Sequence, residues 1–278
     1  MLLKNLINNL KPELAVHKIR GISFDSRIIK KGDLFISILG NKFDGDKYIK
    51  HAVSKGATAV IHSRPLKKIK KIFYIKVKDA RDTLAKISVK FFKKKPKNII
   101  AVTGTNGKTS ISDFFHQIFT LQNKKVGFLG TLGSKKNKKL ETRNLTTLDP
   151  VRLSKDLSDM KKKGIDNVII EASSHGLKQK RLNYLNIKAG VFTNLSHDHL
   201  DYHETMRDYL NSKLLLFNKI LRKNGSIITD TDINQYKNLK KIQKKRKLKI
   251  FTIGSRSNCF KILRYKIHQN FQFLEIEY

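Results

Sequence analysis

The chain has 278 residues, of which 39% are hydrophobic, so it can form one large domain or two ordinary ones with apolar cores. Its 59 Lys and Arg residues against 22 Asp and Glu give a net charge of +37, but the lysines form short clusters along the whole length, which favours a compositional bias over a nucleic-acid-binding stripe. A single cysteine, Cys259, excludes an internal disulfide, and no apolar run suits a signal peptide or a membrane span, so we expect a soluble cytoplasmic protein without a membrane partner.

The first segment of the chain reaches to about residue 92 and combines short strands with turns. Residues 48–53 predict a helix that ends at Gly56, and residues 57–62 predict a strand. The basic linker Lys93–Lys97, which contains Pro96, follows. We therefore place two domains at residues 1–94 and 95–278.

The second segment alternates strands and helices. Buried strands are predicted at residues 126–129, 168–170, 189–193 and 226–229. Leu153, Leu157 and Met160 indicate a helix between two of them. This alternation predicts an α/β fold with a mostly parallel, doubly wound sheet that binds ligands at the carboxyl ends of its strands. Past Phe251 the pattern changes, and residues 260–273 predict an antiparallel hairpin.

The sequence ThrGlyThrAsnGlyLysThrSer, at Thr103–Ser110, follows the apolar run Ile99–Val102. An amphipathic helix is predicted after it, with an inward stripe of Ile111, Phe114, Phe115, Ile118 and Phe119. A glycine-rich turn between a strand and a helix is typical of a phosphate-binding loop, because backbone N–H groups point at the anion and the lysine adds a positive charge. The first glycine of the usual pattern is replaced by Val102, so the bend must come from Gly104.

Two further signals come at predicted strand ends. Glu171 ends an apolar strand, and a carboxylate beside a phosphate loop suits Mg²⁺. The segment Thr193–His203 holds three histidines and two aspartates after another strand. It can be read as a polar loop that caps the next helix, as one imidazole and one carboxylate near a nucleotide-bound Mg²⁺, or, least favoured, as a zinc site that uses His199 and His203.

Lys213 lies on the apolar stripe of the next predicted helix, between Leu210 and Phe217. A charged lysine on an inward face is costly unless it is paired or neutralised. Its ammonium can reach water while its stem stays buried, or the lysine can be modified at an active site. Carbamylation by CO₂ would convert the amine into a carboxylate-like group able to approach a metal.

In this order and spacing, the motifs of the whole chain resemble the Mur ligase family, the ATP-dependent amino-acid ligases of peptidoglycan synthesis. The first segment contributes AspSerArg, GlyAspLeuPhe, PheAspGly and LysGlyAla, which begin at Asp25, Gly32, Phe43 and Lys55. The second contributes the phosphate loop, LeuThrThrLeuAspPro, GluAlaSerSerHisGlyLeu and AspHisLeuAspTyrHis. The resemblance implies a small N-terminal α/β domain (1–94) that binds the UDP substrate and a central P-loop domain (95–278) with a terminal antiparallel hairpin. The family's C-terminal amino-acid-binding domain is expected to be absent from this chain.

The resemblance also implies a set of site residues. The ATP phosphates would be held by Gly104, Thr105, Asn106, Gly107, Lys108, Thr109 and Ser110. Mg²⁺ would be held by Thr109, Glu171, His199 and Lys213, the last as a carbamate. Contacts to the uridine diphosphate end are expected from Ser26, Asn41, Lys42 and Phe43. Contacts to the muramoyl-dipeptide portion are expected from Thr146, Thr147, Ser173, Gln179 and Arg181. Lys108, Lys213 and His199 would carry the catalysis.

The implied reaction adds the third amino acid, meso-diaminopimelate or L-lysine, to UDP-N-acetylmuramoyl-L-alanyl-D-glutamate through an acyl phosphate, in a monomer without a nucleic-acid partner. Leu148 replaces the proline usual in the family, which loosens the loop but keeps Thr146 and Thr147. Three alternatives stay open: a ligase like folylpolyglutamate synthetase, a non-catalytic module that binds nucleotide or UDP-sugar, and a basic nucleic-acid-binding NTPase.

Overall fold

The computed structural model describes residues 1–40, 43–67, 69–136, 139–141, 145–198 and 201–278. The chain divides into two units. Unit 1 comprises Met1–Lys94 and Asp149–Ser158, and unit 2 comprises Lys95–Leu148 and Asp159–Tyr278. Among the helices of the described ranges, none is both long and apolar enough to cross a membrane.

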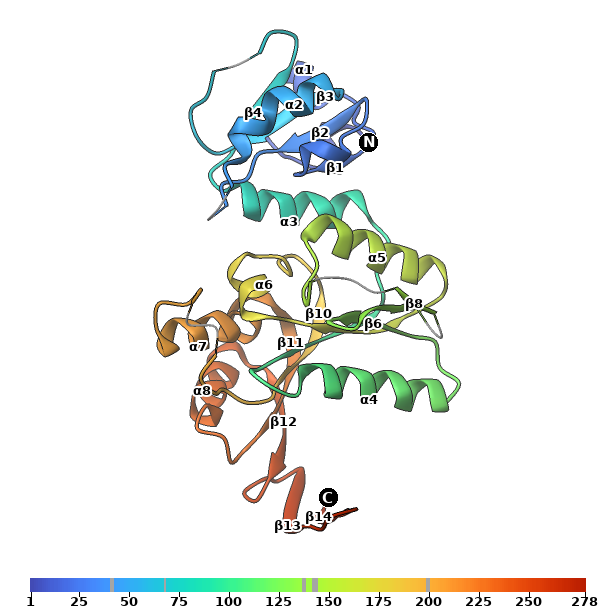
Figure 1. Cartoon of the computed structure of the whole chain (residues 1–278), viewed down its shortest axis with the longest axis vertical. Helices are drawn as coiled ribbons and strands as arrows, with labels where there is room; N and C mark the ends of the chain where they lie inside the picture. Colours follow the sequence, from blue (N-terminus) through green and yellow to red (C-terminus); the bar gives the residue numbers. More distant parts are fainter. Residues whose placement is uncertain (41–42, 68, 137–138, 142–144, 199–200) are drawn as a thin grey trace. The chain divides into compact units, whose positions relative to one another are not determined.

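Unit 1 contains a four-stranded parallel sheet in the order β1-β2-β3-β4 (Figure 1). The strands are β1 (Ile22–Ser23), β2 (Asp33–Ile36), β3 (Ala57–His62) and β4 (Phe73–Lys76). The helices that precede Lys94 are η1 (Leu3–Asn5), α1 (Pro12–Ala15), η2 (Ser26–Ile28), η3 (Gly45–Tyr48), α2 (Ile49–Ser54) and α3 (Ala80–Phe91).

Side chains alternate across the unit 1 sheet, so β2 and β3 each contribute to two cores. Leu34 and Ile61 pack in one cluster with Leu84 of α3. Phe35 and Val60 pack in the other with the residues of α2. A parallel strand that is covered on both faces has apolar residues at successive positions, and β2 and β3 follow that pattern.

Unit 2 contains a ten-stranded sheet in the order β14-β13-β12-β11-β10-β5-β9-β6-β7-β8. Its strands from β13 through β6 are parallel neighbours, and both ends carry antiparallel pairs. The strands are β5 (Asn98–Thr103), β6 (Val126–Gly130), β7 (Gly133–Lys136), β8 (Lys139–Glu141), β9 (Asn167–Glu171), β10 (Ile187–Phe192), β11 (Leu221–Asp230), β12 (Lys249–Gly254), β13 (Phe260–Ile267) and β14 (Gln272–Glu277). The expected mostly parallel sheet with a terminal hairpin is confirmed.

Helices connect the parallel strands of unit 2, as the alternating pattern predicts. They are α4 (Lys108–Leu121), α6 (Ser174–Lys178), α7 (Met206–Leu215), η4 (Leu216–Ile220) and α8 (Tyr236–Arg246). A further helix, α5 (Pro150–Lys162), begins in unit 1 and ends in unit 2. Helix α4 packs on β5, β6 and β9, and α6 packs on α7.

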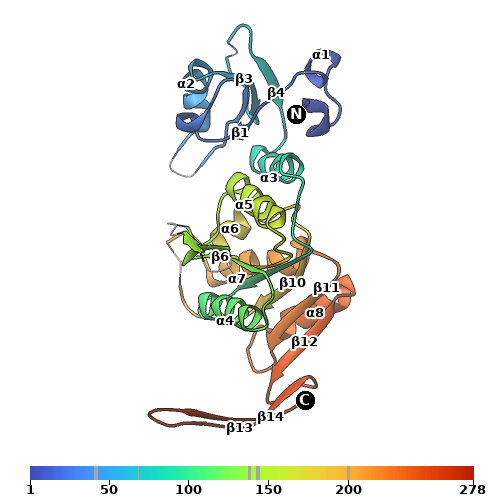
Figure 2. The ribbon, with the colours of Figure 1, turned by 90° about the vertical axis from the view of Figure 1, so that its right-hand side faces the viewer.

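One predicted apolar face differs from the structure. The stripe expected on α4 is wrong at Phe114 and Ile118, which are 60% and 53% exposed. The inward face of α4 is instead formed by Ile111 and Phe115, because that side meets Val102, Phe128 and Ile169 of the sheet. The hairpin β13–β14 is present as a two-stranded ribbon beyond β12 (Figure 2), and both of its faces carry exposed apolar side chains.

Candidate functional site

The phosphate-loop sequence forms the turn between β5 and α4. Gly104 has φ +151° and Gly107 has φ +81°, so both adopt backbone conformations that favour glycine. A Cβ added at Gly104 would lie 1.8 Å from Thr193 Oγ1. The bend lies at Gly104, as predicted. Glycine is required there both by the φ angle and by the close approach of the segment that follows β10.

The residues after β10 hold this turn in shape. Thr105 N–H donates to the Asn194 carbonyl at 3.0 Å, and Asn106 N–H donates to Asn194 Oδ1 at 2.9 Å. Thr193 Oγ1 donates to the Asn106 carbonyl at 2.6 Å. The first turn of α4, from Lys108, has N–H groups without intrahelical acceptors, which is the arrangement that binds an anion.

Lys108 lies across its own loop. Its Nζ donates to the Thr105 carbonyl at 2.6 Å and to the Gly104 carbonyl at 3.1 Å. Burial lowers the pKa of Lys108, and the carboxylates of Glu171 and Asp198 partly oppose that shift. The side chain thus supplies a cation at the loop. A bound phosphate group can replace the two carbonyl oxygens as the hydrogen-bond partner of this cation.

Glu171 ends β9 with its side chain fully buried beside the loop. Thr109 Oγ1 donates to Glu171 Oε2 at 3.1 Å, and Thr131 Oγ1 donates to the same oxygen at 3.0 Å. Thr131 N–H donates to Oε1 at 3.1 Å. One carboxylate and two hydroxyl groups form an oxygen-rich donor set, which fits Mg²⁺. The motif analysis did not include Thr131, whose only signal was its place directly after the strand β6.

The residues expected to contact a dipeptide lie on the same edge of the sheet. Thr147, which is buried, donates from Oγ1 to the Glu171 carbonyl at 2.8 Å and accepts from Ser173 N–H at 2.9 Å. Ser173 is the N-cap of α6, because its Oγ accepts from Gly176 N–H. Thr146 Oγ1 lies 3.1 Å from Thr131 Oγ1.

Arg181 and Gln179 complete this group. Arg181 Nη1 donates to the Thr147 carbonyl at 2.5 Å, and its Nη2 donates to Gln179 Oε1 at 2.7 Å. Leu148, in place of the usual proline, is buried and leaves these contacts in place. The structure therefore brings together Glu171, Thr146, Thr147, Ser173, Gln179 and Arg181.

Lys213 is the most buried cation among the described side chains near the loop, with 1% of its surface exposed. Its Nζ donates to the Gly104 carbonyl at 2.6 Å and lies 4.2 Å from the ring centroid of Tyr209. The ammonium does not reach water, so the alternative in which it does so is wrong. Burial lowers the pKa of Lys213 to about 7, with a further contribution from Lys108.

Tyr209, which the motifs did not single out, connects α7 to the phosphate loop. Its hydroxyl lies 3.3 Å from Thr105 Oγ1, and its ring is fully buried. Burial raises the pKa of Tyr209, so the phenol keeps its proton. Its place four residues before Lys213 puts both side chains on one face of α7.

His203, one half of the zinc alternative, is not available to a metal. Its Nε2 lies 2.9 Å from Ser174 Oγ and its Nδ1 lies 3.1 Å from Asp208 Oδ2. Within the described part of the chain there is no group of three or more His, Cys, Asp or Glu residues that could hold a metal ion. His199, expected as a magnesium ligand, lies outside the described residues.

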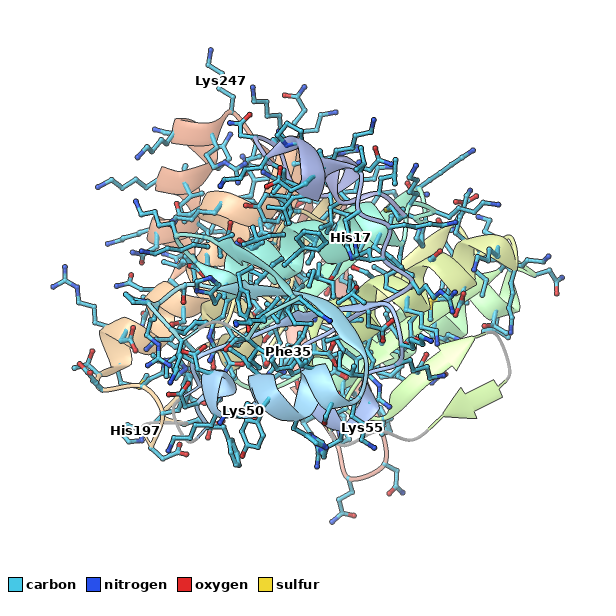
Figure 3. The ribbon with its side chains drawn as sticks, turned by 90° about the horizontal axis from the view of Figure 1, so that it is seen from above. His17, Phe35, Lys50, Lys55, His197 and Lys247 are labelled. Carbon is cyan, nitrogen blue, oxygen red and sulfur yellow. The ribbon has the colours of Figure 1, made fainter. Side chains whose placement is uncertain are left out.

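The expected uridine-diphosphate contacts belong to unit 1. Ser26 is buried at the start of η2, and its Oγ lies 3.0 Å from His51 Nδ1. Phe43 is 70% exposed, whereas Asn41 and Lys42 lie outside the described residues. Lys50, on α2, and Lys55, which follows it, are exposed cations of the same unit (Figure 3).

Comparison with known proteins adds a family to this geometry. Residues 18–92 match the model described as "Mur ligase family, catalytic domain", and residues 102–277 match "Mur ligase middle domain". The chain is similar to the UDP-N-acetylmuramoyl-L-alanyl-D-glutamate--2,6-diaminopimelate ligases of Bradyrhizobium diazoefficiens and Rickettsia montanensis. The identities are 36% and 39%, over 91% and 90% of this chain and 53% of each relative.

A solved structure with the same description, a UDP-N-acetylmuramoyl-L-alanyl-D-glutamate--2,6-diaminopimelate ligase, is similar in fold. It superposes with a TM-score of 0.83 at 28% identity, over 99% of this chain and 57% of its own. The chain thus spans about half the length of the curated relatives it matches.

Proposed function

Because the chain belongs to the Mur ligase family, we propose that it binds the nucleotide and the UDP substrate of a ligase that adds meso-diaminopimelate to UDP-N-acetylmuramoyl-L-alanyl-D-glutamate. The observation that carries the proposal is the convergence of Lys108, Glu171 and Lys213 at the phosphate loop, on the carboxyl ends of β5 and β9. The names of the relatives supply the substrate and the amino acid.

ATP is the proposed energy source, and its phosphates would lie on residues 104–110. The positive φ angles of Gly104 and Gly107, the first turn of α4 and the Lys108 ammonium support this assignment. Lys108 would leave the Thr105 carbonyl and donate to the transferring phosphoryl group. Its charge, held in a partly buried site, would stabilise the negative charge that develops there.

Mg²⁺ is the proposed metal, with Thr109, Glu171 and His199 as the residues that would hold it. The carboxylate and hydroxyl oxygens around Glu171 support this choice, because Mg²⁺ prefers oxygen ligands. When bound, the ion would neutralise charge on the ATP phosphates. The Thr109 and Thr131 hydroxyls keep the Glu171 carboxylate oriented toward the loop.

Carbamylation of Lys213 is proposed as a modification of this site. A neutral Nζ would form a bond to the carbon of CO₂ as one C=O π bond opens and leaves a negatively charged oxygen, and the nitrogen would lose one proton. The lowered pKa supports the reaction, since burial favours the neutral amine over the ammonium. With ¹³C-bicarbonate, we expect a carbamate carbon resonance in wild type that Lys213→Met lacks. Identical spectra for the two proteins would contradict the modification.

The substrate would lie with its dipeptide near Thr146, Thr147, Ser173, Gln179 and Arg181, and with its uridine diphosphate on Ser26, Asn41, Lys42 and Phe43. The Arg181 guanidinium, held by the Thr147 carbonyl and by Gln179, supports binding of a carboxylate. The D-glutamyl carboxylate would attack the γ-phosphate of ATP and form an acyl phosphate, and ADP would leave. The neutral amine of the amino acid would then attack the acyl carbon, inorganic phosphate would leave, and the nitrogen would lose one proton to give the amide. We propose that the protein acts as a monomer in the cytoplasm without nucleic acid.

Calorimetric titration of the 278-residue chain tests this function. We expect saturable binding of UDP-N-acetylmuramoyl-L-alanyl-D-glutamate and weaker binding of UDP-N-acetylglucosamine, which lacks the dipeptide. Arg181→Met should remove most of that difference, and Ser26→Ala should weaken both ligands. An absence of binding, or equal affinity for the two UDP-sugars, would contradict the proposal.

A further inference from the structure

A partly buried chain of hydrogen bonds joins α6 to α7 in unit 2. It runs from Ser174 Oγ to His203 Nε2 at 2.9 Å and from His203 Nδ1 to Asp208 Oδ2 at 3.1 Å. Ser174 and His203 are 1% and 0% exposed. Lys178 Nζ donates to Asp208 Oδ2 at 2.7 Å, so the carboxylate is also ion-paired.

The partners of the imidazole define its proton position. Asp208 is an acceptor, because its ion pair with Lys178 and its bond to His203 lower its pKa. His203 therefore carries its proton on Nδ1 and accepts the Ser174 hydroxyl proton at Nε2. Burial lowers the pKa of His203, which agrees with a neutral ring. The order of groups is that of a hydrolytic triad, but burial keeps Ser174 Oγ away from any substrate.

The same imidazole lies between the two halves of the proposed active site. On the α6 side, Ser174 directly follows the N-cap residue Ser173, which contacts Thr147. On the α7 side, the His203 ring lies 5.1 Å from the Tyr209 ring, whose hydroxyl reaches Thr105 of the phosphate loop. The centroids of the His175 and Tyr202 rings lie 3.9 Å apart, and Gln179 Nε2 donates to the Tyr202 hydroxyl. His203 thus contacts Ser174 of α6, next to the residues expected to bind the dipeptide, and Tyr209 of α7, which reaches the phosphate loop.

We propose that His203 is a positioning residue that fixes α6, and with it Ser173 and Arg181, for binding of the muramoyl-dipeptide; this inference rests on the proposed function. Its two hydrogen bonds fix the ring in one tautomer and set the distance between α6 and the start of α7. If either bond is lost, a buried polar group loses its partner, and α6 can shift to satisfy it. The dipeptide contacts then lose their alignment, whereas residues 104–110 keep their own supports from Thr193 and Asn194.

Two substitutions of His203 distinguish the contributions of its two hydrogen bonds, and a substitution of Ser174 removes one of them from the other side. His203→Gln can place an acceptor near Ser174 Oγ and loses the donor to Asp208. His203→Asn can keep the donor to Asp208 and does not reach Ser174. Ser174→Ala removes the hydroxyl and leaves Asp208 unchanged. His268→Asn, at an exposed histidine in the β13–β14 turn, is the matched control.

For each variant, calorimetry gives Kd for UDP-N-acetylmuramoyl-L-alanyl-D-glutamate and for ADP, and thermal unfolding gives Tm. We expect His203→Asn and Ser174→Ala to raise Kd for the dipeptide ligand roughly tenfold, with Kd for ADP within about twofold. His203→Gln should retain more affinity than His203→Asn, and the double variant His203→Asn/Ser174→Ala should be no weaker than His203→Asn alone.

A purely structural role would lower Tm and leave the affinity of the folded variants unchanged. Folded variants that bind the dipeptide ligand as tightly as wild type, or that lose ADP affinity equally, would therefore overturn the inference. If His203→Asn does not fold, Ser174→Ala and His203→Gln decide the question. A wild-type chain that does not bind the dipeptide ligand would overturn the proposed function first, and this inference with it.

Discussion

Gly104 shows how one residue sets the geometry of the phosphate loop. An added Cβ would lie 1.8 Å from Thr193 Oγ1 and 3.0 Å from Thr193 Cβ. At Gly107 the same addition meets only Thr193 atoms at 3.9 and 4.0 Å. The two glycines therefore differ. Gly104 is required by the neighbouring Thr193 side chain and by its φ angle, whereas Gly107 is required by its φ angle alone.

We expect Gly104→Ala to abolish measurable ADP binding, because either the loop or the Thr193 segment must move. Gly107→Ala should cost only about 1–2 kcal/mol of stability, the usual penalty for a left-handed alanine. Calorimetry with ADP and thermal unfolding measure the two effects. Adding Thr193→Ala to Gly104→Ala should restore part of the binding, and wild-type affinity in Gly104→Ala alone would disprove the packing argument.

Lys213 predicts a dependence of stability on pH. Its pKa is about 7 in the folded protein and 10.5 as the ordinary value, so between these values the unfolded chain binds more protons. The free energy of unfolding should therefore rise with pH, by about 1.4 kcal/mol per pH unit from this group. Denaturant unfolding of wild type and Lys213→Met, in CO₂-free buffers from pH 7 to 9, measures the difference.

The matched control for that experiment is Lys219→Met, an exposed lysine on η4. It should follow the wild-type pH profile. A Lys213→Met profile that also runs parallel to wild type would show that the folded protein does not depress the pKa of Lys213.

Single residues differ in how well the sequence predicts them. Lys108, Glu171 and Lys213 were predictable, because a loop motif, a strand-end carboxylate and a cation on an apolar stripe are local signals. Thr131, Tyr209 and the Ser174–His203 pair were not, because each acquires its partner from a segment distant in sequence. Threonine, tyrosine and serine are also common in ordinary loops and helices.

At the scale of elements, α4 shows the limit of periodicity. Phe114 and Phe115 both fit an amphipathic stripe, yet Phe115 packs against the sheet and stacks on Phe119 at 4.3 Å, whereas Phe114 is exposed. When apolar residues cover more than one face of a helix, their periodicity does not show which of them face the sheet. The strands were better predicted, because continuous apolar runs of β-branched residues are typical of buried parallel strands.

This packing predicts unequal effects of two neighbouring substitutions. Phe115→Ala should lower the free energy of unfolding by roughly 1–3 kcal/mol, since it removes part of the core between α4 and the sheet. Phe114→Ala should change it by less than about 0.5 kcal/mol. Urea unfolding of both variants measures the values, and equal losses would contradict the burial pattern of α4.

At the scale of the whole molecule, the charge of +37 comes from lysines distributed over both units. Lys50, Lys55 and Lys247 are exposed examples (Figure 3). Both units match Mur ligase models, which favours the ligase over the folylpolyglutamate-synthetase and nucleic-acid alternatives. The positive field would still raise the encounter rate with anionic nucleotides and UDP-sugars.

The nucleic-acid alternative can be tested separately. Scattered lysines give only non-specific, salt-sensitive attraction to phosphates. A 20-base-pair fluorescent duplex should therefore dissociate as salt rises from about 50 to 200 mM, and ADP should not displace it. Fluorescence anisotropy measures both. A duplex that remains bound at high salt, or competes with ADP, would support a nucleic-acid-binding NTPase.

The central claim is that the turn between β5 and α4 binds the phosphates of a nucleotide through Lys108. Calorimetric titration of the 278-residue chain with ADP in the presence of Mg²⁺ tests it most directly, with Lys108→Ala as the test and Lys124→Ala, at an exposed lysine after α4, as the control. We predict one-to-one binding that Lys108→Ala weakens roughly 10- to 100-fold and Lys124→Ala leaves unchanged. Wild-type affinity in Lys108→Ala, or no binding by the wild-type chain, would contradict the account.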